Sequence, residues 1–430
     1  PFYGSFPKCL SLVYKVKHKT ENIISEENYL TVLKHKSDLP VVNLVTHQSN
    51  IDGYEKGIMV FGKEAEEDAG FYKNWWNRNA NFQNRGVESE RPVHMQYFVN
   101  GVLDWEQDLA MRISGNATRG FPQKSIRISA NRMYGKDKIE YNFFGKEGLK
   151  KYTSLVIRNS GNDNTKTMFA DLLMQKLVTS ENILTQKGQP VEVFLNGNYW
   201  GIYNVRERID VYLISKKEDV KIDEVTLLES NGELKEGLDS DRIAFEEFIK
   251  QLEKENLSGE EIFQLADQTI DLLSFIDYII YETYYGNGDW PNNNVQWYKA
   301  GNSKWKWILQ DLDYGMAYSG KQNIEVNLFE KLKKSEGVTS RIFNALLLSD
   351  QFINQLNERA SEILKSDFSA ERVKSVFEEI KSRYNSAIEF QIRRWRMIDS
   401  REDWEQNCRN NLDFLLNRSV IYNKQVEDLK

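Results

Sequence analysis

The sequence predicts an α+β protein of two lobes, with a β-rich first half that contains one helix and a mainly helical second half. Short apolar runs that alternate with turns dominate from residue 39 to about residue 205. After residue 210, apolar residues recur at helical spacing. No internal repeat or low-complexity linker separates the halves, which favours lobes that pack together over independent domains. With 430 residues, 40% of them hydrophobic, the chain can bury a large core.

The first half is expected to begin with an extension. Residues 1–38 are polar and rich in Lys, with a weak strand-like patch at 10–16. Strands are then predicted at 41–45, 57–61, 93–100, 109–113 and 125–128. Residues 70–90, which are rich in Asn, Trp and Gly, are expected to form a long irregular loop.

A helix and two hairpins organise the rest of the chain. A polar start and apolar residues at helical spacing predict a helix over 163–177. A hairpin follows, because 191–195 and 199–205 flank Asn196-Gly197, a dipeptide that tolerates the positive φ angles of a tight turn. Helices are expected at 242–252, 262–265, 271–285 and within 341–429, and a second hairpin at 295–299 and 304–309. The predicted division is an extension (1–38), a β-rich lobe (39–207) and a helical lobe (208–430).

Composition excludes several classes of protein. A net charge of -7 argues against binding nucleic acid through massed phosphate contacts, which require clustered Lys and Arg. No run of eighteen apolar residues exists, so no membrane span is expected. The two Cys cannot build a four-thiolate zinc site, and all four His fall in the first quarter of the chain. A metal in the second half would therefore have oxygen ligands, which suits magnesium, manganese or calcium.

Two acidic segments flank the second hairpin. Asp289 and Asn294 precede it, and Asp311 and Asp313 follow it, so an antiparallel pair of strands would bring them together. Phosphoryl transfer needs one carboxylate to orient the attacking hydroxyl, and an amide oxygen and a second carboxylate to hold magnesium. Asp289, Asn294 and Asp311 supply these groups in order. The alternative is that these residues only form turns, because Asp and Asn are common in turns.

A cationic partner for phosphates is expected in the β-rich half. The best candidates are Arg119 and Lys124, in a segment where Gly115 and Gly120 allow the backbone to approach a ligand closely. Alternatively, the basic residues that alternate with isoleucines over 124–128 form the solvated face of a strand.

Five stretches together resemble the spore coat protein H (CotH) kinase-like family, whose members are atypical protein kinases. They are residues 39–45, 112–128, 191–210, 287–294 and 308–315. The resemblance implies a two-lobed atypical protein-kinase-like fold. Because members of the family are often secreted or surface-associated, it also implies a secreted or cell-surface protein of a bacterium.

The resemblance also implies roles for individual residues. Lys124 matches the phosphate-contacting lysine and belongs to the catalytic set. Arg119 lies in the loop that approaches the nucleotide, and Glu207 matches a residue of the segment where the adenine would lie. Met168 stands where many relatives have an Arg, and Gln310 replaces an aromatic residue next to the metal-binding acid.

The roles implied for the helical lobe concern catalysis and metal binding. Asp289 matches the catalytic aspartate. Asn294 and Asp311 match the magnesium ligands, and Asp313 is the second acid of an Asp-x-Asp motif that assists the metal.

The expected function is therefore ATP- and magnesium-dependent transfer of a phosphoryl group to Ser or Thr of a protein substrate, carried out by a monomer. Two alternatives are open. One is a catalytically silent, kinase-like surface module that binds a polymer or a partner protein through aromatic loops, with Trp75-Trp76 the most suggestive pair. The other is a metal-dependent phosphohydrolase built on Asp289, Asp311 and Asp313.

Overall fold

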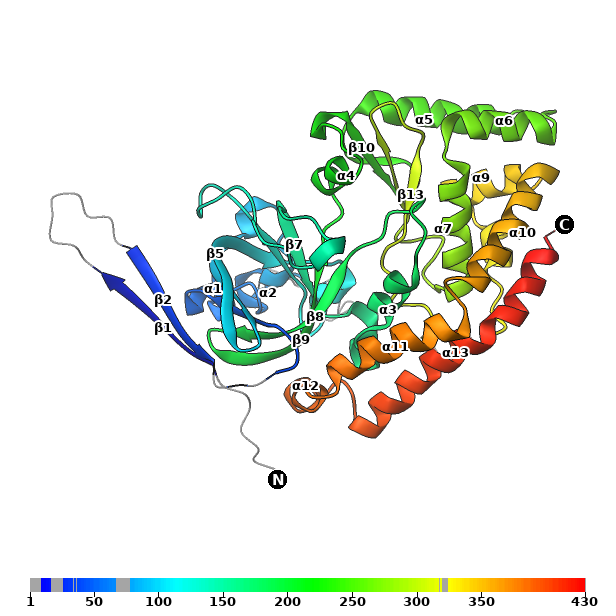
Figure 1. The fold of residues 1–430 in the computed structure, drawn as a ribbon. Helices are drawn as coiled ribbons and strands as arrows, with labels where there is room; N and C mark the ends of the chain where they lie inside the picture. The colour runs from blue at the N-terminus through cyan, green and yellow to red at the C-terminus, as the bar shows by residue number, and fades with distance from the viewer. Residues whose placement is uncertain are drawn as a thin grey trace. The chain divides into compact units, whose positions relative to one another are not determined.

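The computed structural model describes residues 9–16, 26–33, 35, 37–66, 78–316, 318 and 324–429 (Figure 1). The chain divides into two compact units. Unit 1 contains residues 1–168, 188–206 and 382–404, and unit 2 contains residues 169–187, 207–381 and 405–430. Each unit is therefore assembled from three separate stretches of sequence.

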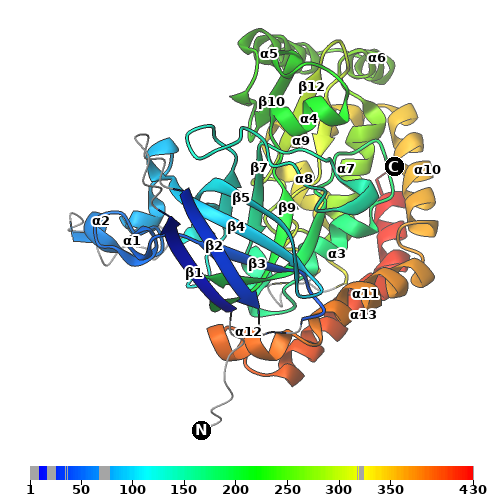
Figure 2. The ribbon, with the colours of Figure 1, turned by 60° about the vertical axis from the view of Figure 1, so that its left-hand side comes forward.

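Unit 1 is built around a closed β-barrel with the strand order β3-β4-β5-β6-β7-β9-β8 (Figure 2). Its strands are β3 (Val41–Val45), β4 (Arg91–Val99), β5 (Val102–Ile113), β6 (Ile126–Ser129), β7 (Ser154–Arg158), β8 (Gly188–Leu195) and β9 (Asn198–Glu207). The barrel closes through β3 and β8, which pair in parallel. Apolar side chains such as Leu44, Ile128 and Val193 are fully buried, as the alternation along the strands requires.

A short helix from far along the chain packs on this barrel. Helix α12 (Ile388–Trp395) brings Phe390 against a buried cluster of Val41, Phe98, Phe194 and Tyr199. The other helices that lie wholly in unit 1 are α1 (Gln48–Asp52) and α2 (Gly62–Glu66). Strands β1 (Cys9–Val16) and β2 (Glu26–Leu33) form a separate antiparallel pair.

Unit 2 combines a four-stranded sheet with helices. The sheet has the order β11-β10-β12-β13, formed by β10 (Val225–Glu229), β11 (Glu233–Glu236), β12 (Gln296–Ala300) and β13 (Lys306–Ile308). The helices are α3 (Ala170–Leu177), α4 (Val211–Lys217), α5 (Asp239–Leu252), α6 (Gly259–Thr269), α7 (Leu272–Tyr285), α8 (Leu328–Lys334), α9 (Val338–Leu346) and α10 (Asp350–Lys365). Helices α11 (Ala370–Tyr384) and α13 (Arg401–Glu427) each begin in one unit and end in the other.

Helix α7 is deeply buried, and the predicted acidic residue Asp289 follows it in the sequence. It begins where the Asp271 carboxylate accepts a hydrogen bond from Ser274 N, and it ends at Gly286 with φ 63°. Almost every side chain between these two caps is buried, which agrees with the nearly continuous apolar sequence. The left-handed glycine turns the chain out of the helix and into the segment that carries Asp289.

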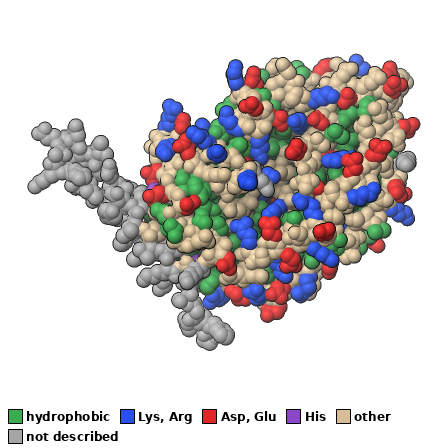
Figure 3. All heavy atoms as spheres, in the orientation of Figure 1, with side chains coloured by type: hydrophobic (Ala, Val, Ile, Leu, Met, Phe, Trp, Pro, Cys, Tyr) green, Lys and Arg blue, Asp and Glu red, His purple; other side chains and the backbone are tan. Residues whose placement is uncertain are grey.

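Several sequence predictions are confirmed. The chain is an α+β protein, both predicted hairpins are present as β8–β9 and β12–β13, and α5, α6 and α7 coincide with three predicted helices. Within the described residues, no helix is both long and apolar enough to cross a membrane. On the face shown in Figure 3, the described Lys and Arg side chains are interspersed with Asp and Glu and form no basic stripe.

Other predictions are wrong in detail. Residues 57–61 form no strand, because Ile58 N and Met59 N donate to backbone carbonyls of Asn50 and Ile51 in α1. The helix predicted over 163–177 is α-helical only from Ala170, and residues 161–165 form a 3₁₀ turn instead. The segment after residue 210 also contains the strands β10 and β11, which were not predicted.

The delayed start of α3 has a local cause. The Asp163 carboxylate accepts hydrogen bonds from Thr167 N (3.0 Å) and Thr167 Oγ1 (2.6 Å). Such a side chain competes with the helical backbone for its donors. Met168 then adopts φ 71°, so the chain changes direction before α3 begins. Of the predicted loop at 70–90, residues 78–90 include two short 3₁₀ turns, whereas Trp75 and Trp76 lie outside the described residues.

Candidate active site

Asp289 is held between the end of a buried helix and a buried tryptophan. After Gly286 ends α7, Asn287 N donates to Glu282 O (3.3 Å) and Trp290 N donates to Asn287 O (3.2 Å). The Trp290 side chain is fully buried, and its indole N–H donates to the Tyr278 hydroxyl (2.9 Å). The backbone on both sides of Asp289 is therefore fixed by contacts with α7.

The second acidic segment leaves β13 and lies against the first one. Gly288 N donates to Tyr314 O (3.2 Å), and Met316 N donates to Tyr285 O (2.8 Å). The backbone of this second segment is unusual, because Asp311 has φ 56°. Non-glycine residues rarely adopt such angles, although Asp and Asn do so more readily than others, and such residues occur both in turns and at functional sites. The structure thus brings the Asp289 and Asp311 segments together within unit 2.

The Asp289 carboxylate is half-buried. Within the described residues, its oxygens take part in no hydrogen bond or ion pair. Burial raises the pKa of Asp289, the nearby Asp311 carboxylate raises it further, and the Lys331 ammonium opposes both. A half-buried carboxylate with a raised pKa and available oxygens has the properties of a general base.

Two further carboxyl groups, those of Asp171 and Glu282, lie near Asp311, and neither was singled out from the sequence. The Asp171 carboxylate, in the first turn of α3, accepts a hydrogen bond from Leu312 N (3.1 Å). Glu282 is fully buried near the end of α7, and Asn287 Nδ2 donates to its Oε2 (2.9 Å). The sequence does contain a signal that could have identified this buried acid, because Glu282 stands within the apolar run of α7.

Burial raises the pKa of Glu282 to about 8, and the carboxylates of Asp311 and Asp171 raise it while the Asn287 amide lowers it. Asn287 Oδ1 is also buried and accepts no hydrogen bond within the described residues. Glu282 is therefore largely protonated at neutral pH, which limits the negative charge concentrated in this part of unit 2.

The predicted metal ligands lie on the same two segments. Asn294, with φ 62°, follows Asp289, and the Asp313 side chain is buried two residues after Asp311. These side chains offer only oxygen donors, the type that magnesium prefers. In the described part of the chain, no three His, Cys, Asp or Glu side chains are arranged to hold a metal ion. Oxygen donors of this kind suit magnesium, which proteins usually hold through one or two carboxylates while phosphates and water supply the other ligands.

Glu207 ends strand β9 and is fully buried in unit 2. Its Oε2 accepts hydrogen bonds from Lys217 Nζ on α4 (2.9 Å) and from Lys187 N (3.2 Å). Its Oε1 is buried and accepts no hydrogen bond within the described residues. The carboxylate therefore forms a buried ion pair that fastens the end of β9 to the start of the helical part of the chain.

Arg119 and Lys124 lie together in unit 1, and both are buried. Arg119 donates to the carbonyls of Gly115 (2.8 Å), Phe82 (2.7 Å) and Ile113 (2.8 Å). Lys124 Nζ donates to Arg119 O (2.7 Å) and Phe121 O (2.9 Å) and lies 3.7 Å from the centre of the Phe82 ring. Lys124 is therefore not on the solvated face of a strand, which excludes the alternative interpretation of this residue.

Burial accounts for the electrostatics of this cationic pair. It lowers the pKa of Lys124 to about 8, with a smaller contribution from the charge of Arg119. The pKa of Arg119 is lowered to about 10 by burial and by the neighbouring Arg85 and Arg112. In this structure Lys124 binds carbonyls of its own loop, whereas Arg119 also binds the carbonyls of Phe82 and Ile113.

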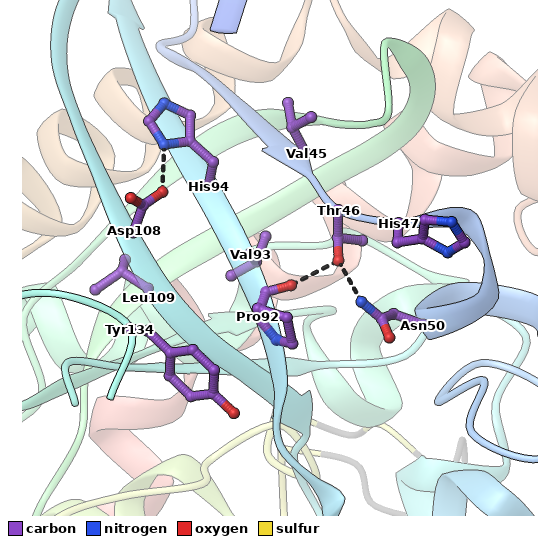
Figure 4. A pocket seen from close by; sticks show the side chains of 10 residues that line it. All are labelled: Val45, Thr46, His47, Asn50, Pro92, Val93, His94, Asp108, Leu109 and Tyr134. Atoms are coloured by element: carbon purple, nitrogen blue, oxygen red, sulfur yellow. Dashed lines mark hydrogen bonds and ion pairs between the residues drawn. The ribbon is translucent and has the colours of Figure 1, made fainter. Parts of the chain in front are cut away.

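A cavity of about 430 Å³ in unit 1 contains none of the residues predicted from the sequence (Figure 4). It lies beside β3, β4 and β5, where His94 Nδ1 contacts Asp108 Oδ1 (2.8 Å) and His94 Nε2 contacts Glu106 Oε2 (3.0 Å). Burial lowers the pKa of His94, but the hydrogen bonds to Asp108 and Glu106 outweigh it, so the pKa is raised. Both ring nitrogens of His94 thus contact a carboxylate.

Unit 2 of this α+β protein thus pairs two acidic segments, which offer the carboxylates that a phosphotransferase needs. The family described as CotH kinase protein matches residues 111–422, nearly three quarters of the chain. The chain belongs to this family. The match includes every residue to which the sequence assigned a catalytic, nucleotide-binding or metal-binding role, from Arg119 to Asp313, whereas β3 and β4 lie outside it. No curated protein matches the chain.

Proposed function

We propose that this chain is an ATP- and magnesium-dependent protein kinase that transfers a phosphoryl group to Ser or Thr. Membership of the family supports the reaction class. The observation that carries the proposal is the Asp289 carboxylate, which is half-buried, has a raised pKa and lies near Asp311 on a segment that its own backbone contacts hold in place.

In the proposed reaction, the acceptor hydroxyl oxygen attacks the γ-phosphorus of ATP. The bond between that phosphorus and the oxygen bridging the β- and γ-phosphates breaks, and ADP leaves. The hydroxyl proton passes to the Asp289 carboxylate, whose raised pKa makes it a better acceptor. Asn294 and Asp311, assisted by Asp313, would hold magnesium, which supplies neutralisation of the phosphate charge.

The proposed phosphate-binding role of Lys124 has a structural requirement. Its ammonium would have to leave the carbonyls of Arg119 and Phe121 at least in part. Burial removes Lys124 from water and lowers its pKa, so an anionic phosphate group would be a favourable replacement partner.

The test is phosphoryl transfer from radioactive ATP in the presence of magnesium, with mass spectrometry to locate the modified residue. Asp289→Asn and Asp311→Ala should each abolish labelling of protein, while Asp223→Asn, at an exposed acid of unit 2, should not. Labelling at the wild-type level in either of the first two variants would refute the assignment. Release of free phosphate without labelled protein would show hydrolysis instead of transfer.

One observation favours a second candidate, a kinase-like binding module without turnover. Both predicted phosphate-contacting cations already bind backbone carbonyls, Arg119 that of Phe82 and Lys124 that of Arg119. Thermal unfolding with magnesium and ATP separates the two functions, because a ligand that binds only the folded protein raises the melting temperature. The kinase should be stabilised by millimolar nucleotide, whereas the module should show no shift.

A further inference from the structure

Lys331 contacts the backbone on both sides of Asp289. It lies in the middle of α8, and its side chain is half-buried. The ammonium donates hydrogen bonds to Gly288 O (2.6 Å) and Trp290 O (2.5 Å). These carbonyls belong to the two residues that flank Asp289 in the sequence, so one cation fixes the curvature of the backbone at the proposed base.

Lys331 also interacts with the side chain between those carbonyls. The Lys331 charge lowers the pKa of Asp289, and the Asp289 charge in turn raises the pKa of Lys331 against the larger effect of burial. The two groups are therefore close enough for their charges to matter. A hydrogen bond from an ammonium to a carbonyl is stronger than one between neutral groups, so two such bonds hold this segment firmly.

The neighbouring lysines of α8 make different contacts. Lys333 and Lys334 both approach Glu330 on the same helix, at 3.6 Å and 3.9 Å, in exposed pairs of the kind that contribute little to stability. The helix therefore offers a matched comparison between a lysine that contacts the Asp289 segment and a lysine that contacts only its own helix.

We propose that Lys331 is a positioning residue for phosphoryl transfer, which holds the carbonyls of Gly288 and Trp290 so that the Asp289 carboxylate is aimed at the acceptor hydroxyl. The inference rests on the proposed function, because it assigns Asp289 as the base. It adds a residue from a helix that follows both acidic segments and that no sequence motif indicated.

The experiment compares Lys331→Met, Lys331→Arg and Lys334→Met in labelling by radioactive ATP with magnesium, the protein itself serving as acceptor. Lys331→Met should lower the maximal rate by about tenfold to a hundredfold, because a small displacement of a reacting group has effects of that size. The KM for ATP should stay within about twofold of the wild-type value, because the loss falls on the chemical step. Lys331→Arg should recover most of the rate, since its guanidinium can also donate to two carbonyls.

Amide hydrogen exchange over residues 286–293 gives a second measurement that does not need activity. Exchange in this segment should become faster in Lys331→Met and stay unchanged in Lys334→Met. Unchanged exchange in Lys331→Met would overturn the proposal, as would a raised KM for ATP with an unchanged maximal rate. If the wild-type protein labels nothing while the exchange result holds, the proposed kinase function fails but the contact of Lys331 with the Asp289 segment stands.

Discussion

Replacing Glu282 with Gln should make the protein more stable than the wild type in alkaline solution. Glu282 is fully buried in α7, and its pKa is raised to about 8. A raised pKa in the folded state means that the folded protein binds the proton more tightly than the unfolded chain does. The contribution of protonated Glu282 to the unfolding free energy is fully present below its unfolded pKa near 4.5. This contribution is lost as the pH rises through its folded pKa of about 8.

The size of the effect follows from the shift. Folding raises the pKa of Glu282 from 4.5, the ordinary value of a solvated glutamate, to about 8, and each pH unit corresponds to about 1.4 kcal/mol. The wild-type protein should therefore lose about 5 kcal/mol of unfolding free energy over this interval, of which about 3 kcal/mol is lost by pH 7. Glutamine stays neutral, has nearly the same shape and can still accept the Asn287 hydrogen bond.

Urea unfolding at several pH values between 5 and 9, followed by tryptophan fluorescence, measures the difference between Glu282→Gln and the wild type. We expect this difference in unfolding free energy to be small at pH 5 and to grow by several kcal/mol in favour of the variant by pH 9. Glu260→Gln, at an exposed position of α6, should show no such growth. A difference that is independent of pH would refute the reasoning, because it would mean that Glu282 titrates alike in the folded and unfolded chain.

Two further predictions concern the stability of unit 2. Asp277→Ala should lower the free energy of urea unfolding by about 3 kcal/mol, because it leaves the Arg359 guanidinium without the buried carboxylate that it contacts at 2.7 Å. A smaller loss of unfolding free energy in the double variant Asp277→Ala/Arg359→Met would support this cause. Gly315→Ala should lower the unfolding free energy by about 1–3 kcal/mol, because the added Cβ would lie 3.1 Å from two backbone carbonyl oxygens. A urea unfolding midpoint equal to that of the wild type would contradict this prediction.

The parts of the fold that the sequence predicted well have short-range causes. Asn196 and Gly197 adopt φ 49° and 76°, the positive angles that their dipeptide predicts, and Leu195 pairs with Asn198 across the turn. The second hairpin was predicted from two strand-like runs joined by a short turn, and it led to the prediction that the two acidic segments lie together. The helical spacing of apolar residues likewise predicted a helix at 271–285, where the structure has α7.

The rest depends on contacts between distant parts of the chain. The barrel closes where Val41 pairs with Glu192, about 150 residues later, and no local pattern specifies that partner. For the same reason, the sequence did not identify every residue near the predicted acids. Glu282 is unusual only because surrounding residues bury it, and Lys331 matters only because α8 places it beside Asp289. Sequence spacing identified the acids on the hairpin flanks but could not identify side chains brought in by packing.

The assembly of each unit from three stretches constrains how the chain can fold as it is synthesised. Unit 1 includes residues 382–404, so its packing cannot be complete until these residues have left the ribosome. Phe390 of α12, which covers the buried cluster of Val41 and Phe194, arrives almost 200 residues after the last barrel strand. A nascent chain that ends between residues 207 and 381 would thus expose part of the barrel's apolar surface, which makes chaperone binding during synthesis an expected consequence of this topology.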